Sequence, residues 1–455
     1  MIRTLALSLA LVVAGNAVEF TSYTPQTKLP NLKKAIDNKI EKKSLKFGFI
    51  KLTDCVPLVV AKELGYFADE GLNVTLEVQS NWKLILERTM SGDLDGAHML
   101  CGQPIAASIG YGAKGDFIVA HSLDLNGNGI TVSPAVWAAM QAAEPRLKEA
   151  GHEHPISAAA LKALAAERRT AGKPLTFGMV FPVSCHNYEL RYWLAAGGLN
   201  PGFYGGYDDP VGNRDGDMSL SVTPPPQMPQ TLAQGTIDGY CVGEPWNQQA
   251  VASGIGVPVA IDQHIWKDNP EKVLGVTRTW AEANPKTLVA VVKALIRAGY
   301  WLDASMDNRK LAVEMLANQS YIGANPAILG ASMLGTFEYV KGDVRKEPEF
   351  NVFYAKNATY PLRSHCVWYL TQMRRWGQIP ENKPDSWYAE QSARIYRPDI
   401  YRTAFGALVA EKAIPAAELP ADDYPSVPGS AFIDGIAFDP KQPNAYLASF
   451  PIGKK

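Results

Sequence analysis

The hydrophobic pattern predicts two similar strand–turn–helix units. The first reads KFGFIKLTDCVPLVVAKELGYF and the second reads TFGMVFPVSCHNYELRYWLAAGG. In each, a short apolar run gives way to a polar turn and then to apolar residues at helical spacing. Phe47 and Cys55 are eight residues apart, as are Phe177 and Cys185, so the two units are offset by 130 positions.

A second pair of matching segments follows these units. SGDLDGAHML and AQGTIDGYCV each place a glycine where a helix should end, then an Asp-Gly turn, then an apolar strand. Gly96 and Gly239 make this offset 143, and the 13 extra residues match an acidic, Gly-rich loop that begins at Gly202. The repeat predicts an α/β fold with two lobes of similar plan and a ligand cleft between them, beyond the carboxyl ends of the strands.

The same pattern sets the expected domain limits. We expect one lobe to comprise residues 45–133 together with 272–410, and the other to comprise residues 134–271. Further helices are expected at 285–305, 308–317 and 360–376. Residues 411–455, rich in proline and alanine near their start, are predicted to form an extended C-terminal tail.

The N-terminal segment MIRTLALSLALVVAGNA is typical of a secretory signal peptide. It has Arg3 near its start, an apolar run from Leu5 to Ala14, and small residues at Gly15 and Ala17. The run is too short to span a membrane, and no cysteine follows that would take a lipid anchor. We therefore expect residues 1–17 to be removed and the protein to be periplasmic; a buried N-terminal element is the alternative.

Composition and charge exclude several classes of function. The chain has 44 Lys+Arg against 45 Asp+Glu, so it lacks the basic character of a nucleic-acid-binding protein. With 47% hydrophobic residues it has ample material for a folded core. The five cysteines are far apart with no C-x-x-C, which predicts buried apolar roles and no metal site. The sequence also contains no phosphate-binding loop and no dinucleotide fingerprint.

The predicted turns after the strands hold the candidate chemistry. Thr53 and Asp54 are expected to cap the helix that follows them. Adjacent side chains on a helix do not face one another, so we do not expect Cys185 and His186 to form a nucleophile–base pair. A histidine near a helix N-terminus is suited to binding an anion, with a structural role as the alternative. Without a convincing acid–base or nucleophile pair, no catalytic residue is predicted and the protein is not expected to be an enzyme.

Several runs resemble the periplasmic nitrate-binding proteins of ABC importers. The resemblance extends from about residue 45 to residue 378, and its most specific runs are KLTDCVPLVVAKELGYFADEGL, GDLDGAHML, LNGNGITVS, HNYELRYWLAAGGLNP, TPPPQMPQTLAQGTIDGYCVGEPWN and IWKDNPEKVLGV. Close relatives in this family bind bicarbonate or act as cytoplasmic nitrate sensors. The resemblance implies a two-lobed periplasmic binding protein, a monomer without a cofactor, that captures nitrate or nitrite and delivers it to the permease and ATPase subunits of an importer.

The resemblance also implies a set of ligand contacts. Carried over residue by residue, they fall at Trp82, Asn128, His186, Pro225, Gly243 and Lys272. Lysine at 272 and histidine at 186 are typical of nitrate binders, whereas bicarbonate binders have an acid at the lysine position and use it with calcium. Asn128 departs from the glutamine of the best-described nitrate binders. Nitrate is a monoanion at physiological pH, so its buried charge needs a cation, which Lys272 and a protonated His186 would supply.

Overall fold

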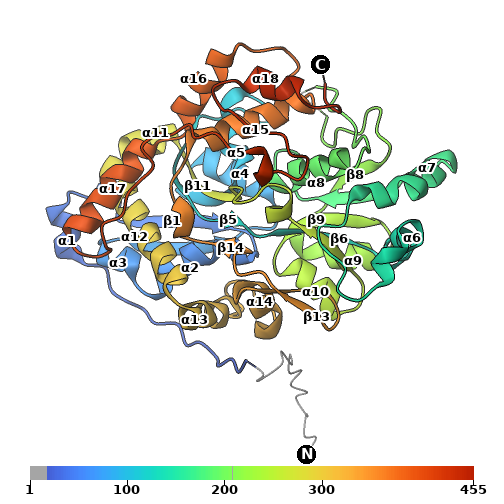
Figure 1. Ribbon diagram of the computed structural model, residues 1–455. Helices are drawn as coiled ribbons and strands as arrows, with labels where there is room; N and C mark the ends of the chain where they lie inside the picture. The colour runs from blue at the N-terminus through green and yellow to red at the C-terminus, as the bar shows by residue number, and fades with distance from the viewer. Residues whose placement is uncertain (1–17, 207–208, 455) are drawn as a thin grey trace, which may run out of the picture.

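The computed structural model describes residues 18–206 and 209–454, and it forms two α/β lobes (Figure 1). The predicted signal peptide, residues 1–17, lies outside the described residues. The α/β class and the two-lobed plan predicted from the sequence are confirmed. Within the part of the chain that is described, no helix is long and apolar enough to cross a membrane.

The first lobe is built on a five-stranded sheet in the order β2-β1-β3-β11-β4. Its strands are β1 (Ser44–Phe49), β2 (Asn73–Val78), β3 (Gly96–Leu100), β4 (Phe117–Ser122) and β11 (Lys272–Thr277). The first three strands are parallel, and β11 runs antiparallel to both of its neighbours. The carboxyl ends of β1, β2 and β3 therefore lie at one edge of the sheet, beside the start of β11.

The second lobe repeats this plan in a sheet of order β10-β6-β9-β7-β8. Its strands are β6 (Asn128–Val132), β7 (Thr176–Met179), β8 (Ser219–Val222), β9 (Gly239–Gly243) and β10 (Val257–Ile261). Strands β7, β8 and β9 are parallel, and β6 is antiparallel to β9 and β10. Read from its other edge, this sheet has the topology of the first, with β6 in the place of β11.

Strand register confirms the internal repeat. Phe47 pairs with Gly96 in the first sheet, and Phe177 pairs with Gly239 in the second, as the offsets of 130 and 143 require. The repeat extends to the antiparallel strands, because Lys272 lies opposite Leu100 while Asn128 lies opposite Gly243. Lys272 and Asn128 therefore occupy equivalent positions in the two lobes.

Helices cover both sheets and continue beyond them. They are α1 (Leu32–Asp37), α2 (Val56–Glu63), α3 (Tyr66–Asp69), α4 (Trp82–Ser91), α5 (Gly102–Ile109), α6 (Pro134–Ala143), α7 (Lys162–Thr170), α8 (Cys185–Ala196), α9 (Met228–Ala233), α10 (Trp246–Ala252), α11 (Arg278–Ala283), α12 (Pro285–Ala304), α13 (Met306–Leu316), α14 (Pro326–Met333), α15 (Arg363–Arg375), α16 (Asp385–Ile395), α17 (Pro398–Ala410) and α18 (Pro443–Ala448). Short strands β5 (Leu125–Asn126) and β14 (Asn351–Val352) pair with each other, as do β12 (Thr336–Val340) and β13 (Asp343–Lys346).

Two details of the expected domain organisation differ from the structure. Strand β6 lies within residues 45–133, which the sequence predicts to belong to the first lobe. In the structure it pairs in the second sheet, so the chain crosses between the lobes before Asn128. The return crossing ends where β11 begins, at Lys272, the residue at which we expected the first lobe to resume. The predicted tail, residues 411–455, includes the helix α18, which packs on α15; there the indole N–H of Trp368 donates to the hydroxyl of Tyr446 (3.2 Å).

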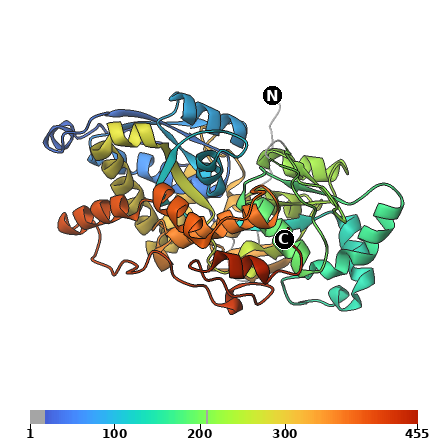
Figure 2. The same ribbon diagram turned by 90° about the horizontal axis from the view of Figure 1, so that it is seen from above.

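The two lobes lie side by side and are in contact (Figure 2). The backbone N–H of Thr53 donates to the carbonyl of Glu244 (2.8 Å), and the indole N–H of Trp246 donates to the carbonyl of Lys51 (2.9 Å). A Cβ added at Gly102, at the start of α5, would lie 1.9 Å from the carbonyl oxygen of Val183. These contacts join the edges of the two sheets at which the strands end, so the cleft between the lobes is closed.

Candidate functional site

Five of the six predicted ligand residues meet in the closed cleft. Trp82 opens α4 after β2 and Lys272 opens β11, both in the first lobe. Asn128 opens β6, Gly243 ends β9, and His186 lies in the first turn of α8, all in the second lobe. All five are buried, so each lobe contributes part of one enclosed site.

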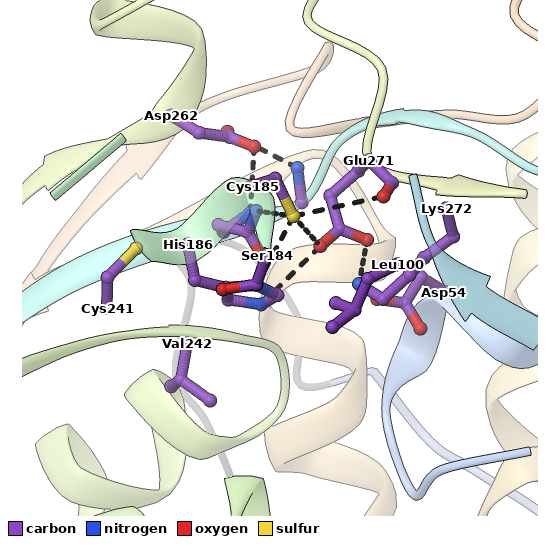
Figure 3. Close-up of polar contacts among 12 residues, drawn as sticks. Asp54, Leu100, Ser184, Cys185, His186, Cys241, Val242, Asp262, Glu271 and Lys272 are labelled. Atoms are coloured by element: carbon purple, nitrogen blue, oxygen red, sulfur yellow. Dashed lines mark hydrogen bonds and ion pairs between the residues drawn. The ribbon is translucent and has the colours of Figure 1, made fainter. Parts of the chain in front are cut away.

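Lys272 is the cation at the centre of this site (Figure 3). Its Nζ lies 2.6 Å from Oδ2 of Asp54, contacts Oε2 of Glu271, and lies 5.5 Å from the ring centroid of Trp82. A lysine ammonium has three N–H donors, and the two carboxylates occupy two of them. Among the described residues, the third N–H has no hydrogen-bond partner, and Nζ lies over the Trp82 ring.

The charges of this ion pair are mutually stabilised. Burial would lower the pKa of Lys272, but Asp54 and the other acidic groups around it outweigh burial and raise the pKa above its ordinary value. Burial likewise opposes ionisation of Asp54, but Lys272 and His98 hold the pKa of that carboxyl below its ordinary value. Lys272 is therefore an ammonium and Asp54 a carboxylate at neutral pH.

The indole of Trp82 presents a donor without an acceptor. Its Nε1 is buried and has no hydrogen-bond partner among the described residues. The rest of the residue is fixed, because its carbonyl accepts from Nε2 of Gln103 (2.7 Å) and its ring packs against His98 with centroids 5.4 Å apart. Unpaired buried donors are uncommon and costly, so this N–H next to Lys272 is a place for an acceptor ligand.

His186 lies against Cys185, contrary to the expectation that the adjacent side chains point apart. Sγ of Cys185 is 3.2 Å from Nδ1 of His186 and 2.7 Å from Oε1 of Glu271, which lies 3.4 Å from His186 Nε2 (Figure 3). Both side chains lie in the first turn of α8 and contact Glu271, the residue that precedes β11. The geometry of a nucleophile–base pair is present, but burial raises the pKa of the Cys185 thiol well above its ordinary value and keeps it protonated.

The charge state of His186 also differs from expectation. Burial, followed by the nearby Lys272, lowers the pKa of His186 well below its ordinary value. His186 is therefore neutral at pH 7, and the predicted role of a protonated imidazole as a second cation is not supported. It offers either one N–H donor or a ring nitrogen acceptor to its neighbours.

Asn128 is held by groups of the second lobe. Its Nδ2 donates to Oε2 of Glu189 (3.2 Å), and its backbone N–H donates to Asp262 (3.1 Å). Its Oδ1 is buried and has no hydrogen-bond partner in the described part of the chain. That oxygen lies beside Gly243, where an added Cβ would be 3.3 Å away.

Pro225 is the sixth predicted contact and follows β8 in the second lobe. It is buried and opens a 3-10 turn, 225–227, after β8, where a rigid extended segment was expected at 224–226. Without an N–H, it cannot donate a backbone hydrogen bond to an anion, and its carbonyl accepts from the backbone N–H of Met228. Among the described residues, it has no part in the polar contacts that join the cleft.

The acidic residues of the site are not recognisable as such from the sequence. Asp54 was expected to cap a helix, but it makes no capping bond and instead contacts Lys272 and His98, with Nε2 of His98 2.7 Å from Oδ1. Glu271 and Glu189 were not singled out. The only available signals were the position of Asp54 in a turn after a strand and of Glu271 next to Lys272.

Among the described residues, two groups of side chains have the spacing to hold a metal ion. Cys185, His186 and Glu271 form one, and Asp54, Asp124 and Glu271 form the other, with ligand atoms within 4.8 Å of one another. Both groups include Glu271, whose carboxylate contacts the Lys272 ammonium. Lys272 thus supplies the positive charge that a metal ion would bring to these carboxylates.

Comparison with known proteins gives matches along most of the chain. The model of the NMT1-like family matches residues 38–317. The nitrate/nitrite binding protein NrtA of Nostoc sp. (strain PCC 7120) is 33% identical over 432 residues, which cover 93% of this chain and 89% of that protein. The nitrate import ATP-binding protein NrtC of Synechocystis sp. (strain PCC 6803) is 38% identical over 421 residues, covering 91% of this chain and 56% of that protein.

The structural comparison agrees with these matches. The crystal structure of the periplasmic nitrate-binding protein NrtA from Synechocystis PCC 6803 superimposes with a TM-score of 0.78 at 29% identity, covering 91% of this chain and all of that one. The chain spans about half the length of the ATP-binding relatives that it matches, which include the bicarbonate transport protein CmpC of Synechocystis at 35% identity.

Proposed function

We propose, on the premise that this chain belongs to the NMT1-like family and is homologous to the NrtA nitrate/nitrite-binding proteins, that it captures nitrate or nitrite for an ABC importer. The ligand enters between the lobes and is enclosed when they close. We further propose that the protein acts in the periplasm as a monomer, delivers the anion to permease and ATPase subunits, and catalyses no reaction.

One observation carries the choice of an anion. The buried indole N–H of Trp82 has no acceptor among the described residues, and it belongs to the ring that lies 5.5 Å from the Lys272 ammonium. Two neighbouring donors, one of them charged, call for a ligand that only accepts hydrogen bonds. Nitrate and nitrite are small monoanions with this property, and charge-assisted hydrogen bonds make such binding favourable.

Bicarbonate is the second candidate, because the CmpC relatives are of similar identity. The buried, unpartnered Oδ1 of Asn128 also favours it, since this acceptor suits the O–H donor of bicarbonate and gives nothing to nitrate. Lys272 argues against it: the resemblance associates bicarbonate binding with an acid at this position and a calcium ion. Lys272 already provides a cation to Asp54 and Glu271, the carboxylates that calcium would otherwise bind.

The test is a ligand screen with the purified mature protein. Nitrate, nitrite, and bicarbonate with and without calcium are titrated while tryptophan fluorescence and heat are followed. We expect saturable 1:1 binding of nitrate or nitrite that is unaffected by calcium. Calcium-dependent binding of bicarbonate in preference to nitrate would refute the proposal.

A further inference from the structure

Glu189 is a buried carboxylate at the edge of the proposed anion site. It lies one helical turn after Cys185 on α8, and its side chain accepts from Nδ2 of Asn128 (3.2 Å) and from Sγ of Cys241 (3.8 Å). None of the ion pairs among the described residues includes it. An isolated buried carboxylate is costly when ionised, so its position beside a predicted ligand residue needs an explanation.

The groups that face Glu189 come from every element packed around it. They are Asn128 of β6, Cys241 of β9, Asp262 after β10, Lys272 of β11, Tyr369 of α15 and Cys185 of α8. Lys272 is the cation among them, and it is already in contact with two other carboxylates. Burial, followed by Asp262, raises the pKa of Glu189 well above its ordinary value, and burial raises that of Asp262 to about 7.

The protonation state of Glu189 decides whether the Asn128 amide is able to turn its other end toward the cleft. An ionised Glu189 can only accept, so it holds Nδ2, and the unpartnered Oδ1 is left beside Gly243. A neutral Glu189 can still accept from Nδ2 through its carbonyl oxygen, but it can also donate its O–H to Oδ1, and in that arrangement Nδ2 is free to face the cleft. Nitrate accepts hydrogen bonds and cannot donate them, so it requires the second arrangement.

We propose that Glu189 is a positioning residue that must be protonated in the anion complex, so that the Asn128 amide can turn its donor toward the anion; where Glu189 is ionised in the free protein, binding then takes up a proton. This inference rests on the proposed function and adds to it a determinant of specificity. The ionised form favours a ligand with an O–H donor, such as bicarbonate, whereas the neutral form favours nitrate. Neutralising Glu189 also removes a buried negative charge from the neighbourhood of the bound anion.

The first experiment measures nitrate affinity between pH 6 and 9.5, a range over which the ligand remains a monoanion. For the wild type we expect constant affinity at the lower end and a loss at higher pH that approaches about tenfold per pH unit. Glu189→Gln, which mimics the neutral acid and keeps a donor for Oδ1, should bind at least as tightly and show no such loss. Glu244→Gln is the matched control: burial raises the pKa of this carboxyl to about 8, but the residue is not bonded to Asn128, so its pH profile should stay that of the wild type.

The second experiment requires no variant. Calorimetric titration of the wild type with nitrate, in buffers of different ionisation enthalpy at pH 9, should reveal proton uptake. Three results would each overturn the assignment to Glu189. The first is a wild-type nitrate affinity that does not change with pH, and the second is the absence of proton uptake. The third is a pH dependence of affinity that persists in Glu189→Gln and vanishes in Glu244→Gln. Nitrate binding in any of these cases would leave the proposed function intact, whereas no binding at any pH would refute both.

Discussion

Replacing Lys272 with glutamine tests the charge balance of the cleft. The substitution keeps a donor but removes the ammonium that contacts Asp54 and Glu271 and adjoins the Trp82 ring. A hydrogen bond involving a charged group contributes about 1.5–3 kcal/mol. We therefore expect nitrate affinity to fall by roughly 10- to 150-fold, and Lys272→Glu, which adds a negative charge, to abolish binding.

The same substitution should also destabilise the fold. Removing one member of a buried ion pair leaves an uncompensated charge and costs about 3–5 kcal/mol, and the Lys272 side chain is 0% exposed. A loss of binding could then reflect a loss of folded protein. Affinity is therefore measured by calorimetry at a temperature at which a thermal melt shows the variant to be folded.

Lys293→Gln is the matched control for this effect. Lys293 is also a buried lysine between two carboxylates, with Nζ 2.8 Å from Glu70 and 2.6 Å from Glu411, but these pairs lie outside the cleft. We expect it to lose comparable stability and keep the wild-type affinity for nitrate. Wild-type affinity in Lys272→Gln would remove Lys272 from the site, and an equal loss in both variants would attribute the effect to stability.

Three further predictions follow from the structure. Trp82→Phe removes the unpartnered N–H and should weaken nitrate binding about tenfold or more. Trp193→Phe is the control, because the indole N–H of Trp193 donates to the carbonyl of Ile156, and it should leave nitrate affinity unchanged. Equal affinities of the two variants in calorimetry would contradict the role of the Trp82 indole. Gly102→Ala places a Cβ against Val183 and should hold the lobes apart, so small-angle scattering should show no compaction when nitrate is added. Gly406→Ala adds a Cβ in open space on α17 and should compact like the wild type. Normal compaction of Gly102→Ala would show that closure does not need this close contact. The five cysteines are all buried and unpaired, so a thiol reagent should react slowly with the native protein and with five thiols after denaturation; rapid reaction of the native protein would show that the cleft opens readily.

The repeat could be predicted from sequence because it depends on local rules. The segments from Phe47 to Cys55 and from Phe177 to Cys185 each comprise a strand end and a turn, and each unit ends its helix near a glycine. The crossing between lobes was less accessible, because β6 is an apolar strand that suits either sheet. Its assignment depends on pairing with β9, a contact between residues more than a hundred positions apart.

The polar contacts inside the site could not be predicted from the local sequence. A turn aspartate before a helix is usually a cap, and nothing near Asp54 in the chain reveals that Lys272 lies 2.6 Å away. The contact of Cys185 with His186 was missed for a related reason. Helical geometry determines the Cα–Cβ direction of each residue, but it does not determine the side-chain conformation. In the first turn of α8, the conformations of Cys185 and His186 bring both side chains to Glu271.

The acidic residues around Lys272 bear on which anions the cleft accepts. Asp54 and Glu271 fix the ammonium but together outweigh its single charge, and His186 is neutral, so these groups leave no net positive charge for a ligand. A monoanion can be held there by one charged donor and neutral N–H groups, whereas a dianion would bring a second buried charge without a counter-ion. We therefore expect sulfate, at a hundredfold excess, to leave the nitrate titration unchanged at constant ionic strength. Displacement of nitrate by sulfate would show that the carboxylates do not limit the charge of the ligand.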